Sequence, residues 1–198
     1  MINKEIIVDG TGHIAGKLGT YIAKKLLEGY TITVLCAESI VLTGPIHRTK
    51  LRYKDYLNKR CLVNPLRGPF HYKEPSKLFM RLVKRMVPYK KKRGAAALQR
   101  LQVFEGIPEK FENTERSICP RALLEYCANP IRKSATYGKL LSEFGWKHLN
   151  ITEEMKKKVL QREEKAKKEK DARMEEIQRI RESSSFNKEV EEIMSRIE

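Results

Sequence analysis

The sequence predicts an α/β protein built around a parallel sheet, and two patterns lead to that prediction. Residues 5–36 read as strand, helix and strand joined by short links, which is the pattern of a βαβ unit. Such a unit requires parallel strands and a right-handed crossover. Further strand-like runs follow at 39–42 and 101–108. A chain of 198 residues is long enough to bury one sizeable core.

The elements of the βαβ unit follow from local patterns. The apolar run at 5–9 predicts a short buried strand, and a glycine-rich turn follows it. Residues 14–28 have helical spacing, and Gly29 is well placed to end that helix. Residues 31–36 predict the second strand. The apolar stripe of the helix consists of Leu18, Ile22 and Leu26.

The turn at residues 10–15 has three possible interpretations. Gly10, Gly12 and Ala15 match the G-x-G-x-x-A fingerprint of dinucleotide-binding turns, and Glu38 stands where a ribose-binding acid would lie. The helix N-terminus could instead receive an RNA phosphate, helped by His13. We favour a purely structural turn, because little chain remains for a catalytic domain and no further βαβ repeat is evident. The next segment is also rich in cations, which a nicotinamide site does not need.

Nearly all of the net charge lies in residues 45–100. This stretch holds seventeen lysine and arginine residues but only two acids, Asp55 and Glu74, so it carries +15 of the chain's +16. A field of one sign requires a polyanion, and this distribution indicates nucleic acid. The stretch divides into a helix at 48–60, a proline-stiffened loop at 64–75, a helix at 77–87 and a cationic run at 90–93. The candidate RNA-binding residues are Arg48, Lys50, Arg52, Lys59, Arg60, Arg67, His71, Tyr72, Lys73, Lys77, Arg81, Lys84, Arg85, Lys90, Lys91, Lys92 and Arg93.

The helix at 77–87 is the most clearly amphipathic element. Ser76 is a suitable N-cap and Pro88 ends the helix. Solvated faces usually mix charges of both signs, so a face of cations without acids indicates phosphate contacts. The apolar face holds Leu78, Phe79, Leu82, Val83 and Met86, and the basic face holds Lys77, Arg81, Lys84 and Arg85.

Aromatic residues are interleaved with these cations. Phe70, Tyr72 or Tyr89 could stack on unpaired bases, whereas we expect Phe79 to pack in the core. Helix-turn-helix, zinc-finger and basic-zipper patterns are absent from the sequence, which disfavours sequence-specific DNA binding. A DNA-compacting basic protein stays open as an alternative.

The remaining chain predicts an end to the globular part and then a charged arm. A short helix is expected at 120–127, and Trp146 is expected to anchor the core or a partner. We place an α/β domain at 1–150, with the basic insertion at 45–100, and an arm at 151–198. The arm has thirteen cations and thirteen acids, which predicts one long helix at 153–182 and, after a Ser183–Ser185 break, a second short amphipathic helix.

The sequence disfavours an enzyme or a membrane protein. The four histidines are scattered, and G-x-S-x-G, H-E-x-x-H and P-loop patterns are missing from the sequence. The four cysteines lack zinc-site spacing, so we expect reduced thiols, no metal and no cofactor. Apolar runs long enough to span a bilayer and a secretory signal pattern are also not evident in the sequence. A small nucleotide-dependent oxidoreductase is the enzymatic alternative.

Several motifs together resemble the universal large-subunit ribosomal protein thirteen family. They lie in the same order over about residues 4–148, although Tyr89 stands where the family often has histidine. The resemblance implies a three-layer α/β/α fold around a parallel four-stranded sheet, with a long C-terminal helical extension. It implies binding to large-subunit ribosomal RNA and to neighbouring ribosomal proteins, with Arg67, His71 and Lys73 as RNA contacts, and a role in subunit assembly and translation. The arm indicates a eukaryotic protein, hence a cytoplasmic ribosome with nucleolar passage during assembly. The motifs are Asp9–Leu18, Ala37–Ile40, Asn64–His71, Pro75–Ser76, Lys92–Gly94, Val103–Pro108 and Gly145–Lys147.

Overall fold

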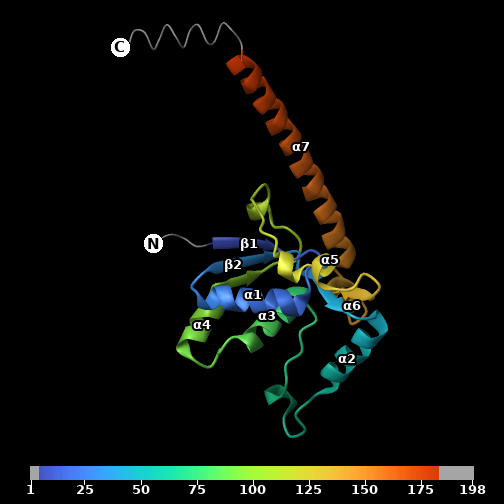
Figure 1. Cartoon of the computed structure of the whole chain (residues 1–198). Coiled ribbons are helices and arrows are strands. Elements are labelled where there is room, and N and C mark those ends of the chain that lie inside the picture. The colour runs from blue at the N-terminus through green and yellow to red at the C-terminus, as the bar shows by residue number, and fades with distance from the viewer. Residues whose placement is uncertain (1–4, 183–198) are drawn as a thin grey trace. The chain divides into compact units, whose positions relative to one another are not determined.

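The computed structural model describes residues 5–182 and confirms the mixed α/β class. The chain divides into two compact units, residues 1–156 and 157–198. The first unit holds the sheet and the helices that cover it (Figure 1). In the second unit, the described residues continue a helix that ends at Glu182.

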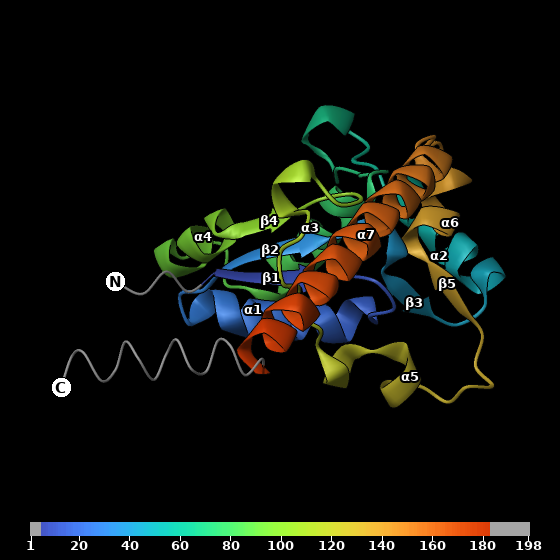
Figure 2. The same ribbon diagram turned by 90° about the horizontal axis from the view of Figure 1, so that it is seen from above.

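Three parallel strands form the main sheet, in the order β1, β2, β4 (Figure 2). β1 (Glu5–Asp9) pairs along its whole length with β2 (Thr31–Leu35), which pairs on its other side with β4 (Leu101–Val103). The prediction of a four-stranded parallel sheet is therefore wrong, because the main sheet has three strands. β3 (Val41–Thr43) forms a separate antiparallel pair with β5 (Ser134–Thr136).

β3 leaves the main sheet because the chain turns sharply after β2. Cys36 has a φ of 53°, in the left-handed region, and a 3₁₀ turn at Ala37–Ser39 follows it. Non-glycine residues rarely adopt this conformation, and here it redirects the chain. The place beside the end of β2 is taken by the chain after β4, where the Gly106 carbonyl accepts the Cys36 N–H at 3.0 Å.

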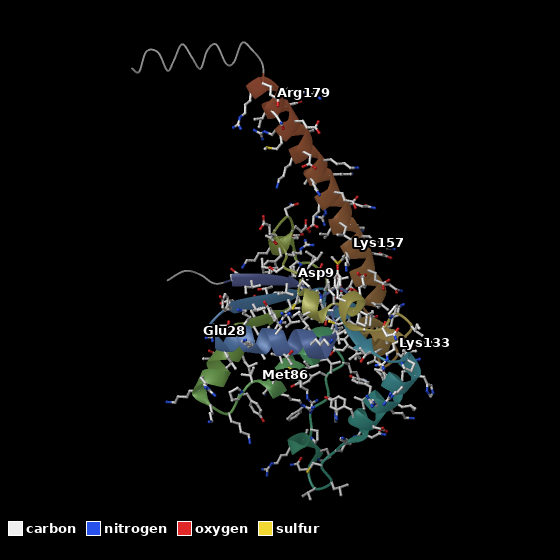
Figure 3. The ribbon with its side chains drawn as sticks, in the orientation of Figure 1. Asp9, Glu28, Met86, Lys133, Lys157 and Arg179 are labelled. Carbon is white, nitrogen blue, oxygen red and sulfur yellow. The ribbon has the colours of Figure 1, made fainter. Side chains whose placement is uncertain are left out.

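Three helices cover one face of the sheet. α1 (Ala15–Leu27) packs against α3 (Pro75–Met86), and α4 (Lys92–Gln99) contacts α1 and β4. Figure 3 shows Met86 of α3 next to α1. A Cβ on Gly19 would come within 2.4 Å of the Leu82 side chain, so the absence of a side chain at Gly19 allows the close approach. The core of this face includes Leu18, Ile22, Leu26, Ile32, Val34, Phe79 and Val83.

The opposite face of the sheet is covered by an irregular segment, residues 104–117. It contains one 3₁₀ turn at Glu109–Phe111. Alternate residues of a strand point to opposite faces, so Ile7 and Leu35 meet Phe111 here while their neighbours face the helices. The three layers of this unit are thus helices, sheet and a loop segment.

The helices of the basic stretch begin earlier than the sequence indicated. α2 runs over Ile46–Asn58 rather than 48–60. α3 starts at Pro75, with Glu74 at the N-cap, so Ser76 is not the cap. Proline suits the first helical position because its φ is already helical and it has no N–H to leave unpaired. Ser76 is inside the helix, and its hydroxyl donates to the Glu105 carboxylate at 3.0 Å.

The C-terminal part of the first unit is more broken than predicted. The helix expected at 120–127 is a 3₁₀ turn at Pro120–Ala122 followed by the one-turn α5 (Leu124–Cys127). After α6 (Tyr137–Ser142), Trp146 is buried and packs in the core. The long helix predicted at 153–182 is confirmed as α7 (Leu149–Glu182). The second short helix, expected after Ser185, lies outside the described residues.

Candidate nucleic-acid interface

The basic stretch forms a surface made of four pieces. We call it the basic surface: the cations of α2, of the loop at 59–74, of α3 and of residues 90–93. The loop contains a short 3₁₀ turn at Pro65–Arg67, which begins where the Asn64 side chain accepts the Leu66 N–H. Most of the candidate RNA-binding side chains are exposed, whereas Lys50, His71 and Arg81 are half-buried.

Two tyrosines of α2 hold the loop in place. The Tyr53 hydroxyl donates to the Tyr72 carbonyl at 2.6 Å, and the Tyr56 hydroxyl donates to the Phe70 carbonyl at 3.0 Å. The Tyr56 ring also meets the His71 ring edge-on, with centroids 4.6 Å apart. These bonds fix the backbone and leave the Phe70 and Tyr72 rings exposed. A loop with few apolar residues is therefore ordered by hydrogen bonds from a helix.

Arg81 is part of the fold as well as of the basic surface. Its guanidinium donates to the Phe70 carbonyl and lies 4.6 Å from the centre of the Tyr56 ring. Burial, followed by the neighbouring charge of Arg85, lowers the pKa of Arg81. The sequence predicted four equivalent cations on α3, but Arg81 joins α3, α2 and the loop. We therefore treat its guanidinium as a support for the surface.

Some cations of the stretch already have partners within the protein. Lys50 pairs with Glu143 at 2.6 Å, and Lys77 pairs with Glu74 at 2.8 Å. Such partly exposed pairs are worth little and can be exchanged for phosphate. Arg100 differs, because its guanidinium points inward and donates to the Leu26 carbonyl at 2.8 Å. Its charge contributes to the local total without lying on the basic surface.

Two grooves cross the basic surface. The first, of about 710 Å³, lies between the loop, α3 and Tyr89, and the second, of about 540 Å³, lies between α2 and α3. Arg81 and Arg85 line both grooves. Of the other predicted RNA-binding residues, Tyr72, Lys77 and Lys84 line the first groove and Arg52 lines the second. Outside both grooves lie Arg48, Lys50, Lys59, Arg60, Arg67, His71, Lys73, Lys90, Lys91, Lys92 and Arg93.

The glycine-rich turn serves the fold. The N–H groups of Gly10 and Gly12 donate to the carbonyls of Leu35 and Ser39. Glu38 is buried and accepts the Gly106 N–H at 3.0 Å, and burial raises the pKa of its carboxyl. A buried glutamate committed to a backbone amide cannot bind a ribose. These contacts argue against a dinucleotide site and favour the structural interpretation over it.

His13 lies inside this turn and joins it to a distant segment. Its Nε2 accepts the Cys119 N–H at 3.0 Å, and its Nδ1 lies 3.0 Å from the Thr11 carbonyl. This pattern requires a neutral ring with the proton on Nδ1. Burial lowers the pKa of His13, while the Thr11 carbonyl and the charge of Asp9 oppose that effect. Both ring nitrogens of His13 thus have partners within the protein.

We expect the free energy of unfolding to fall as the pH drops below His13's usual pKa near 6.5. A lowered folded-state pKa contributes stability above the unfolded-state value and loses it as the pH falls through the folded-state value. The measurement is the thermal midpoint at about pH 7.5 and about pH 5.5. His13→Gln keeps an acceptor but does not titrate, so it should lose less stability over this interval. An equal pH dependence in both proteins would contradict the assignment of this effect to His13. Glu38, whose raised pKa affects stability in the opposite direction, is present in both proteins and does not alter the comparison.

The structure also gathers cations that the sequence analysis missed. Lys17, Arg132 and Lys133 line a smaller hollow of about 240 Å³ beside α5. Figure 3 labels Lys133 on the segment that leads into β5. Lys17 is more than a hundred positions from Arg132 and Lys133 in the sequence, so a charge count along the chain could not join them.

The described residues contain neither a cluster of metal ligands nor a helix that could span a membrane. Within residues 5–182, His, Cys, Asp and Glu side chains do not gather in groups of three that could hold a metal ion. Across the same residues, every helix is too short or too polar to cross a bilayer. The four cysteines, Cys36, Cys61, Cys119 and Cys127, are free thiols.

The fold and the basic surface define a small α/β protein with a broad positive face. Comparisons with known proteins give the family. The sequence model of the family described as ribosomal protein L13 matches residues 3–110. The chain belongs to the ribosomal protein L13 family, as the motifs indicated. It is accordingly a structural protein and not an enzyme.

Three curated relatives, each named large ribosomal subunit protein uL13, are similar over most of the chain. The protein of Spodoptera frugiperda is 42% identical over 156 residues, which is 79% of this chain and 76% of its own. The Caenorhabditis elegans protein is 42% identical over 156 residues, or 79% and 77% of the two chains. The Drosophila melanogaster protein is 39% identical over 158 residues, or 80% and 77%.

Proposed function

We propose that this chain is a structural constituent of the large subunit of a eukaryotic cytosolic ribosome. The observation that carries the proposal is its similarity to three eukaryotic uL13 proteins over about four-fifths of its length. The charge distribution supports it independently, because residues 45–100 carry a net charge of +15 while the rest of the chain is nearly neutral. Such a stretch suits a partner with a dense phosphate backbone.

Large-subunit ribosomal RNA is the proposed partner of the basic surface. The cations near the N-termini of α2 and α4 support this assignment. α4 begins at Lys92 after Lys91, without an acid in its first turn, and α2 likewise begins with a basic turn. The N-terminal end of a helix is itself positive, so cations there are unfavourable unless an anion lies nearby. RNA phosphates would supply that anion, with all the exposed cations of the basic surface as candidate contacts.

The arm at 151–198 is proposed to contact neighbouring ribosomal proteins. Several apolar side chains of α7 are exposed, including Ile151, Met155 and Met174. These side chains do not follow a heptad repeat, so we do not favour a coiled coil with a second copy of the chain. We keep the sequence-based division, with a domain at 1–150 and an arm at 151–198. Nucleolar passage during subunit assembly is part of the same proposal.

Co-sedimentation tests this function. A tagged copy of the full chain, expressed in eukaryotic cells, should travel with the large subunit after the two subunits are separated on a density gradient. It should stay bound through moderate salt washes, because many phosphate contacts act together. Recovery of the chain only in the soluble fraction, or with the small subunit, would contradict the proposal. Equal competition by duplex DNA and structured RNA for the purified chain would favour a DNA-compacting protein instead.

A further inference from the structure

The first groove on the basic surface has a composition that distinguishes it from the surrounding cations. Its volume of about 710 Å³ is in the range of small-molecule sites. Three exposed aromatic rings, Phe70, Tyr72 and Tyr89, line it beside the apolar Met80 and Leu98. Its cations are Lys77, Arg81, Lys84 and Arg85.

This combination matches the chemistry of a nucleotide more closely than that of a duplex or a protein. Among the described lining residues there is no acid, although Glu74 pairs with Lys77 nearby. Phosphates alone would need only the cations, and a backbone-binding surface does not require an aromatic-lined hollow. Rings in a groove cannot reach bases that are stacked within a helix. They can reach a base that has left the stack, and its phosphates would lie beside the cations at the rim.

The groove is also held ready for a ligand. The carbonyls of Phe70 and Tyr72 are fixed by the Tyr56 and Tyr53 hydroxyls, so their rings project from an anchored backbone. On the other side, the Lys84 ammonium lies 5.0 Å from the centre of the Tyr89 ring. A site whose walls are ordered before binding loses less conformational entropy when the ligand arrives.

We propose that this groove receives one unpaired base of the bound RNA. The base stacks on the Tyr72 ring, and Lys84 and Arg85 contact the adjoining phosphates. The inference rests on the proposed RNA-binding function and narrows it, because it selects RNA with an extruded nucleotide over a continuous duplex. The basic surface elsewhere contacts phosphates without distinguishing the two.

Two matched RNA hairpins test this inference with the full chain. One carries a single bulged 2-aminopurine, and the other has the same sequence fully paired. Wild-type protein should bind the bulged hairpin more tightly and quench its fluorescence. Tyr72→Ala should weaken binding to the bulged hairpin by roughly five- to a hundredfold and abolish the preference, with little effect on the paired hairpin. Tyr72→Phe should restore both the preference and the quenching, since the ring is what stacks.

The control is Tyr21→Ala, which removes an exposed ring on α1 outside the groove and should leave both affinities unchanged. Tyr72→Ala keeps the carbonyl that Tyr53 binds, and unchanged circular dichroism would show that it folds. Equal affinities of Tyr72→Ala and wild type for the bulged hairpin would overturn the inference and indicate that another partner, such as a protein segment, fills the groove. In that case RNA binding itself would persist. Failure of wild-type protein to bind either hairpin would overturn the assignment of RNA as the partner of the basic surface as well.

Discussion

Replacing Lys77, Lys84 and Arg85 by glutamine is expected to weaken RNA binding by roughly one to two orders of magnitude near 0.15 M salt. Each lost phosphate contact removes the release of about one counterion, so the slope of log K against log salt should fall by about two to three units. The measurement is a series of dissociation constants for a large-subunit RNA fragment at increasing salt. Arg81 is left in place because its loss would also release the loop.

The matched control removes three exposed cations from other parts of the first unit. Lys24, Lys110 and Lys139 changed to glutamine give a protein of the same net charge as the triple variant of α3. If affinity depends only on total charge, the two proteins will lose it equally. An unchanged salt slope in the α3 variant would show that this face is merely solvated.

The second large effect is expected from Gly94→Ala. A Cβ at this position would lie 2.1 Å from the Pro88 carbonyl oxygen, and a backbone atom cannot move aside as a flexible side chain can. We expect a loss of about 2–4 kcal/mol in the free energy of unfolding, which lowers the melting temperature by roughly 4–16 °C. Residues 90–93 lie between Pro88 and Gly94 in the chain, so relief of the clash would displace their cations. RNA affinity should therefore fall together with stability. Thermal unfolding and the same RNA titration measure the two effects.

Gly16→Ala is the control for this substitution. Gly16 is exposed on α1, and a Cβ there would meet nothing within 4 Å. Alanine is a better helix former than glycine, so this variant should be as stable as wild type or more stable by up to about 1 kcal/mol. If Gly94→Ala has the same melting temperature as wild type, Pro88 and α4 can move apart with little loss of stability.

Local patterns predicted most of the helices and the position of the basic stretch. The apolar stripe of α1 and the two faces of α3 repeat with the helical period, and both helices form where that period indicates. The family also followed from motifs that are local in sequence. The start of α3 differs from the prediction because proline is well suited to the first helical turn, so Pro75 belongs to the helix.

Long-range contacts account for what the sequence did not reveal. β3 has only three residues, so its partner is chosen by the left-handed turn at Cys36 and by the arrival of β5, neither of which has a clear local signal. A charge count treats all cations alike, yet Arg100 reaches an interior carbonyl and Arg81 supports a loop. Which cation lies inward depends on carbonyls brought near by the fold.

The two tyrosine bonds that anchor the loop have a consequence for how binding responds to conditions. Both donors are uncharged hydroxyls, so added salt does not screen them as it screens an ion pair. Burial raises the pKa of Tyr53, which keeps its hydroxyl protonated in ordinary buffers. The loop should therefore stay anchored while ionic strength rises and phosphates dissociate. A steep salt dependence would then report the ionic contacts themselves, and the protein would leave and rejoin its RNA with the binding face already assembled.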